Sequence, residues 1–133
     1  MPPSPVFFTD RDLGADQLPA GLREAGYLIV THEVHFNKRQ DVYDPEVIAE
    51  CARQGWYLLT GDGDMPRRWA AEIREARLGV FCQTNNHQGP RLWVPRIIAA
   101  KPKILRAVKN WEKPFVGFIT AEAMPSVNRA KFI

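Results

Sequence analysis

The sequence predicts an α/β fold, a three-layer α/β/α sandwich with a mostly parallel central sheet, and three observations lead to this prediction. Short apolar runs alternate with helical patterns along the chain, which is the order that β-α-β units produce. The run YLIVT at residues 27–31 contains a continuous aliphatic stretch, as expected of a strand covered on both faces. The length of 133 residues, 45% of them hydrophobic, fits a single domain spanning 1–133.

The first predicted strands enclose a helix. Residues 6–9 form a short apolar run that stops at Asp10, which is typical of a buried strand. Residues 16–25 place leucines on one helical face, and Pro19 is tolerated only in the first turn of such a helix. The second strand follows at 27–31.

A second helix is predicted to begin at an acidic cap. Residues 32–43 have mixed polarity and no periodicity, so we predict a loop there. Asp44 can accept hydrogen bonds from the free amide groups of a helix whose first position is taken by Pro45. Gly55 ends this helix. The apolar run at 57–60 is the third predicted strand.

The same alternation continues through the rest of the chain. Pro95 and Pro102 are expected to kink or break the longest helix, and the tail after residue 120 is not assigned. The predicted elements are, in order, a helix at 69–76, a strand at 79–82, a loop at 85–89, a helix at 91–111 and a strand at 115–120.

Charge is unevenly distributed around a formal net charge of +3. Residues 1–90 carry 9 basic and 13 acidic side chains, whereas residues 91–133 carry 9 basic and 2 acidic ones. An acidic part suited to metal and a basic part suited to a polyanion are therefore hypotheses to test. A solvated basic helix face is the alternative for the second part.

The composition also indicates a cellular compartment. Cys51 and Cys82 lie in apolar segments, as buried free thiols of a reducing compartment do. No apolar run approaches the roughly 20 residues that a membrane span needs, and the N-terminus lacks the pattern of a signal peptide. We expect a soluble, cytoplasmic protein without a membrane partner.

Carboxylates follow three of the predicted strands. Because the carboxyl ends of parallel strands meet at one edge of the sheet, where ligands bind, we expect these acids to converge. Converging carboxylates repel one another unless a cation neutralises them, and oxygen ligands suit Mg²⁺ or Mn²⁺. Such an ion supports hydrolysis of a phosphodiester. The acids are Asp10 and Asp12 after the first strand, Asp44 and Glu46 at the helix after the second, and Asp62 and Asp64 after the third.

Most of these acids also have a structural interpretation. Asp62, which follows Thr60-Gly61, is the acid that we favour first as a metal ligand. The structural alternatives are a turn acceptor for Asp10, a helix cap for Asp44, a partner of the helix dipole for Glu46, and turn residues for Asp12 and Asp64.

The order of these motifs resembles a known family. The segments are FFTDRDLG (7–14), LREAGYLIVTH (22–32), DPEVIAECARQGWYLLTGDGD (44–64), LGVFCQT (78–84) and PFVGFIT (114–120). Together they resemble the PIN-like domains, in particular the VapC-like ribonuclease toxins of bacterial toxin–antitoxin pairs. The middle segment is the most specific, since it joins an acidic helix start to a strand that ends in Thr-x-Asp-x-Asp.

The resemblance implies a Mg²⁺- or Mn²⁺-dependent ribonuclease. Asp10 would be the first acid, Asp44 or Glu46 the second, and Asp62 and Asp64 the last, with Asp10, Asp62 and Asp64 on the metal. An antitoxin partner and a homodimer are also implied.

Basic and aromatic side chains could hold RNA beside these acids. Arg67 and Arg68 could bind a phosphate or simply be solvated, and basic residues at 96–109 could extend the track. Trp93 and Trp111 could stack on bases, although their apolar neighbours favour core packing. The three histidines, His32, His35 and His87, are interpreted as loop or edge residues.

Three other classes of protein compete with this prediction. In a phosphatase of the haloacid dehalogenase type, Asp10 of VFFTDRDLG would be the nucleophile, but Leu13-Gly14 departs from that motif. In a receiver domain Asp62 would accept a phosphoryl group, but FVGFITAEA lacks the expected lysine. A binding module with the same fold and no nuclease activity is the third alternative.

Overall fold

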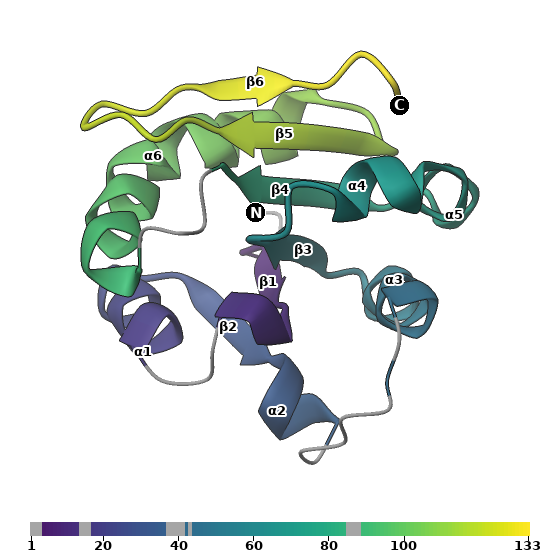
Figure 1. Ribbon diagram of the computed structural model, residues 1–133, viewed down its shortest axis with the longest axis horizontal. Helices are drawn as coiled ribbons and strands as arrows, with labels where there is room; N and C mark the ends of the chain where they lie inside the picture. The colour runs from purple at the N-terminus through teal and green to yellow at the C-terminus, as the bar shows by residue number, and fades with distance from the viewer. Residues whose placement is uncertain (1–3, 14–16, 37–41, 43, 85–88) are drawn as a thin grey trace.

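The computed structural model describes residues 4–13, 17–36, 42, 44–84 and 89–133. Its centre is a six-stranded sheet with the order β2-β1-β3-β4-β5-β6, in which the first five strands are parallel and β6 runs antiparallel to β5 (Figure 1). The strands are β1 (Val6–Thr9), β2 (Leu28–Thr31), β3 (Tyr57–Thr60), β4 (Gly79–Gln83), β5 (Phe115–Ile119) and β6 (Val127–Arg129).

Helices cover both faces of this sheet, which confirms the predicted α/β class (Figure 1). Phe7 of β1 points into a core shared with α1 and α6, whereas its neighbour Phe8 points into a second core shared with α3 and α5. This alternation is what a strand buried on both faces requires. The helical elements are η1 (Arg11–Leu13), α1 (Gln17–Glu24), α2 (His32–His35), α3 (Asp44–Gln54), α4 (Met65–Arg68), α5 (Ala70–Ala76) and α6 (Pro90–Asn110).

The segment predicted as a loop at 32–43 begins instead with a helical turn. The side-chain oxygen of Thr31 accepts a hydrogen bond from the backbone N of Val34 at 3.3 Å, and this cap starts α2 directly after β2. The prediction was wrong for residues 32–35 because no apolar period marks so short a helix. Residues 37–41 and 43 lie outside the described part.

The long helix does not break at its prolines. Pro95 and Pro102 lie inside α6, which runs continuously over 21 residues. Each internal proline costs about 3 kcal/mol, and burial of one whole face of the helix offsets that cost. The residues of that face are Trp93, Ile97, Ala100, Ile104 and Ala107.

Other boundaries differ in smaller ways. The predicted helix at 69–76 is preceded by α4, and the unassigned tail contains β6, whose sequence VNR has no strand alternation. Gly26 and Gly55 follow α1 and α3 with φ angles of 90° and 75°, which favour glycine. Within the described residues, no helix has the length and apolar character needed to cross a membrane.

Candidate active site

Asp10 lies at the carboxyl end of β1 with 5% of its surface exposed. Its backbone N donates to the carbonyl of Leu59 at 3.1 Å, which continues the β1–β3 pairing by one residue. Its Oδ1 accepts from the backbone N of Arg11 at 2.8 Å, and its Oδ2 accepts from Thr60 Oγ1 at 3.5 Å. The carboxylate is therefore held in place at the sheet edge.

The surroundings of Asp10 disfavour the ionised form of its carboxyl group. Burial raises the pKa of this carboxyl, the hydrogen bond from the Arg11 backbone lowers it, and the negative charges of Asp44 and Asp62 raise it further. Asp10, Asp44 and Asp62 thus interact electrostatically although 34 or more residues separate Asp10 from the others. The structure therefore brings together one acid from each of the three predicted positions: after the first strand, at the start of the helix after the second strand, and after the third strand.

Side chains and turns hold the two partners of Asp10. Asp44 begins α3, and its Oδ2 accepts from the indole Nε1 of Trp69 at 3.0 Å. Asp62 follows β3 in a turn where its backbone N donates to Thr60 Oγ1 at 3.1 Å. The Cys82 thiol contacts the Asp62 carbonyl at 3.6 Å from the neighbouring strand. These contacts come from three separate elements and converge on the same edge.

The remaining acids are placed less centrally. Asp64 is exposed, and its backbone N donates to Asp62 Oδ1 at 3.0 Å, so it shares the turn with Asp62. Asp64 precedes α4 without a capping hydrogen bond from its side chain. Glu46 is exposed in the first turn of α3. Asp12 belongs to η1, but its side chain lies outside the described part.

His32 also lies at this edge, and the sequence interpretation treated it as a loop or edge residue without a functional role. It follows β2 directly, and only 3% of its surface is exposed. Burial lowers the pKa of its imidazole, the positive charge of Arg11 lowers it further, and the negative charge of Asp44 raises it. The rule applied to the acids, that residues after a parallel strand lie at the ligand edge, also selects His32.

The donor groups fit a hard divalent cation in their chemistry. Three interacting carboxylates, one of them buried, repel one another, and a cation would relieve that repulsion. The edge also holds the Thr9 hydroxyl and His32 Nε2, which are buried polar atoms without a hydrogen-bond partner in the described part of the chain. Across the described ranges, no three acidic, histidine or cysteine side chains already form a compact metal-binding group.

Similarity to known proteins covers the part of the chain that contains this site. A family model described as a PIN like domain matches residues 5–85, a range that includes the sheet edge with Asp10, Asp44 and Asp62. The chain belongs to the PIN-like domain family. It is also 33% identical over 114 residues to a protein of Mycobacterium tuberculosis named "Putative ribonuclease VapC45", covering 82% of this chain and 81% of that protein. No solved structure matches the chain significantly.

Two exposed arginines follow the acids of this PIN-like domain. Arg67 and Arg68 lie on α4, which starts just after Asp64. The Arg67 guanidinium sits over the ring of Phe132, 4.7 Å from its centroid, whereas Arg68 lies at the exposed end of α4. Both remain candidates for contact with a phosphate.

The other RNA-binding candidates are more strongly tied to the fold. Trp93 is fully buried, so its core interpretation is confirmed. On α6, Lys101 Nζ donates to the Ala25 carbonyl at 2.8 Å and Lys103 Nζ to the Pro125 carbonyl at 2.9 Å. His35 pairs with Glu50, and His87 lies outside the described residues. Part of the basic charge of α6 therefore anchors the helix.

Membership of the PIN-like family also bears on the competing predictions. The haloacid dehalogenase phosphatases and the receiver domains are different families, so the match over residues 5–85 decides against both.

Proposed function

We propose that this PIN-like domain is a Mg²⁺- or Mn²⁺-dependent endoribonuclease and the toxin of a bacterial toxin–antitoxin pair. The observation that carries the proposal is the electrostatic coupling of buried Asp10 to Asp44 and Asp62 at the carboxyl edge of the sheet. The family match and the name of the mycobacterial relative support it. The domain spans 1–133, since α6 and β5 supply buried residues to the two cores.

The proposed site consists of carboxylates, two of which are oriented by hydrogen bonds from neighbouring residues. Asp10, Asp62 and Asp64 hold the cation, and Asp44 is favoured over Glu46 as the second acid because its charge acts on Asp10. A bound divalent ion would activate a water and neutralise charge on the transferring phosphoryl group. The hydrogen bond from Trp69 orients Asp44, and the bond from the Arg11 backbone orients Asp10.

The proposal extends to the substrate, the protein partners and the place of action. Arg67 and Arg68, exposed on α4 next to the acidic turn, bind RNA phosphate as the scissile bond approaches the acids. A cognate antitoxin restrains the enzyme, and a homodimer is proposed from the resemblance alone. The site of action is the cytoplasm, where RNA is available and where the buried free thiols of Cys51 and Cys82 stay reduced.

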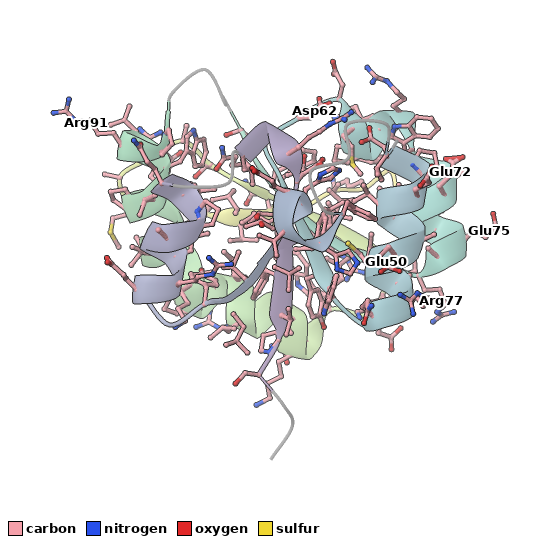
Figure 2. All side chains as sticks on the ribbon, turned by 90° about the horizontal axis from the view of Figure 1, so that it is seen from below. Glu50, Asp62, Glu72, Glu75, Arg77 and Arg91 are labelled. Atoms are coloured by element: carbon pink, nitrogen blue, oxygen red, sulfur yellow. The ribbon has the colours of Figure 1, made fainter. Side chains whose placement is uncertain are left out.

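Ribonuclease activity is tested with the purified full chain on structured and unstructured RNAs. We expect cleavage with Mg²⁺ or Mn²⁺, loss of cleavage after chelation, and loss of cleavage in Asp62→Asn. Glu75→Gln is the matched control because Glu75 points outward from α5, away from Asp62 (Figure 2). Cleavage in a chelator, or full activity in Asp62→Asn, would contradict the proposal.

Toxicity is a separate part of the proposal. Expression of the chain in a bacterium without an antitoxin is expected to arrest growth, and Asp10→Asn is expected to relieve the arrest. Growth is read as optical density and colony number, with immunoblotting to match the expression of both chains. Normal growth with the unmutated chain would remove the toxin assignment and leave the ribonuclease assignment standing.

A further inference from the structure

His32 and Asp10 directly follow matching positions on two neighbouring strands, β2 and β1. In the parallel register of β1 and β2, Thr9 is the partner of Thr31. Asp10 comes directly after Thr9, and His32, the first residue of α2, comes directly after Thr31. Neighbouring strands lie about 4.8 Å apart. His32 and Asp10 therefore start from neighbouring backbone positions at the same edge of the sheet.

One ring nitrogen of His32 lacks a hydrogen-bond partner within the described part of the chain. Its Nε2 is buried and has no hydrogen-bond partner among the described residues. The rings nearest to it, Phe36 at 4.9 Å and Phe8 at 6.1 Å between centroids, carry no polar atom. Buried polar atoms are nearly always paired, and a bound ion or water is a common partner for those that the protein itself leaves unpaired.

His35, three residues along the same short helix, has a different environment. Its Nε2 pairs with Glu50 of α3, and its ring packs against Trp56 with 4.9 Å between centroids. The two histidines share a helix, aromatic neighbours and partial or full burial, but only His32 has an unpartnered nitrogen at the sheet edge. His35 is thus an internal control for His32.

His32 and Asp10 also share their charged neighbours. Asp44 of α3 and Arg11 of η1 act electrostatically on both side chains, and His35 of α2 acts on His32 as well. Burial and the positive charge of Arg11 lower the pKa of His32, which favours the neutral imidazole with a free lone pair. A neutral imidazole is the form that binds metal ions.

We propose that His32 supplies a nitrogen ligand to the divalent cation that Asp10 binds, so that the site binds Mn²⁺ in preference to Mg²⁺. Mg²⁺ strongly prefers oxygen ligands, whereas imidazole adds affinity for first-row transition metals. This inference rests on the proposed metal site, and it adds a ligand type that an all-carboxylate site lacks.

The decisive experiment detects the nitrogen on the metal. Electron spin echo envelope modulation is recorded for Mn²⁺ bound to the full chain and to the His32→Gln and His35→Gln variants. We expect ¹⁴N modulation from a coordinated imidazole in the unmutated chain and in His35→Gln, and its loss in His32→Gln. Absence of nitrogen coupling in the unmutated chain, or its survival in His32→Gln, would overturn the inference.

Metal affinity gives a second readout. Titration calorimetry of the same three chains should show Mn²⁺ affinity falling roughly tenfold in His32→Gln, with a smaller change for Mg²⁺. Equal losses for the two ions would overturn the claim of selectivity. Should His32→Gln fail to fold, as judged by circular dichroism, ¹⁵N-histidine labelling of the unmutated chain still decides, because an unchanged modulation pattern would exclude a histidine ligand.

Failure of the inference can be told apart from failure of the proposed function. RNA cleavage with bound Mn²⁺ but without nitrogen coupling would overturn the role of His32 and leave the ribonuclease standing. Nitrogen coupling from His32 without RNA cleavage would support the metal ligand and contradict the ribonuclease. A chain that binds neither Mn²⁺ nor Mg²⁺ would contradict both.

Discussion

The indole Nε1 of Trp69 donates a hydrogen bond to Oδ2 of Asp44 at 3.0 Å. Trp69 lies between α4 and α5, and Asp44 is the first residue of α3. The segment that carries Arg67 and Arg68 is thereby tied to the acid that acts electrostatically on Asp10. The position of Asp44 therefore depends on the helices that follow β3 as well as on its own helix.

Replacing Trp69 with phenylalanine should lower activity through the position of Asp44. The variant keeps an aromatic ring and loses a hydrogen bond to a charged group, which is worth about 1.5–3 kcal/mol. We expect kcat/KM for RNA cleavage to fall roughly tenfold or more, because small displacements of reacting groups are costly. Trp56→Phe, which alters the stacking on Phe8 and leaves the Trp69–Asp44 hydrogen bond in place, is the control. Equal losses of activity in both variants would contradict a positioning role.

Asp10→Asn should stabilise the metal-free chain at neutral pH. Burial and the charges of Asp44 and Asp62 raise the pKa of Asp10 above its unfolded value, so the ionised carboxylate disfavours the folded state. This destabilisation is absent below the unfolded pKa of 3.8, develops as the pH rises toward the folded pKa, and is complete above it. Urea unfolding between pH 4 and pH 8 measures it. The gain from Asp10→Asn should shrink as the pH falls.

A matched measurement separates this charge effect from a packing effect. Glu75→Gln removes an exposed carboxylate and should leave the free energy of unfolding nearly unchanged over the same pH range. Added Mn²⁺ should stabilise the unmutated chain more than Asp10→Asn, since only the carboxylate binds it strongly. A destabilised Asp10→Asn at neutral pH would show that its hydrogen bonds outweigh the cost of its charge.

The sequence predicted the acids better than it predicted their surroundings. Asp10, Asp44 and Asp62 could be found because each follows an apolar strand or starts a helix, and such local patterns are visible in one sequence. The burial of His32 depends in part on Phe8 of β1, which is distant in sequence and meets His32 only in the folded chain. Local pattern therefore predicted which strand ends carry acids, but not which polar group is enclosed with them.

The same reasoning explains the errors outside the site. The proline signals at 95 and 102 indicated a break in α6, but packing of its buried face overrides that local preference. The strand β6 exists because β5 offers it an edge to pair with, and no feature of VNR itself favours a strand. Both elements are determined by neighbours distant in sequence.

Gly79→Ala should destabilise the fold without altering the site chemistry. A Cβ at this position would lie 2.7 Å from Cζ of Phe115 and 2.7 Å from Cδ1 of Tyr57, which is too close for either ring. Overpacking of this kind costs about 1–3 kcal/mol, to be measured by urea unfolding. Gly89→Ala, where a Cβ meets nothing within 4 Å, should change stability far less. Similar losses in both variants would contradict the packing argument.

Arg68→Gln should weaken RNA binding through the loss of a phosphate contact. Arg68 is exposed at the end of α4, so removal of its charge should leave the fold intact. Binding of single-stranded RNA to the inactive Asp62→Asn chain is measured at several salt concentrations. One lost phosphate contact should reduce the slope of log K against log salt by about 0.7. Arg53→Gln, which removes an exposed arginine paired with Glu50, keeps the net charge matched. If both variants change the slope equally, Arg68 acts only through net charge and does not contact the RNA.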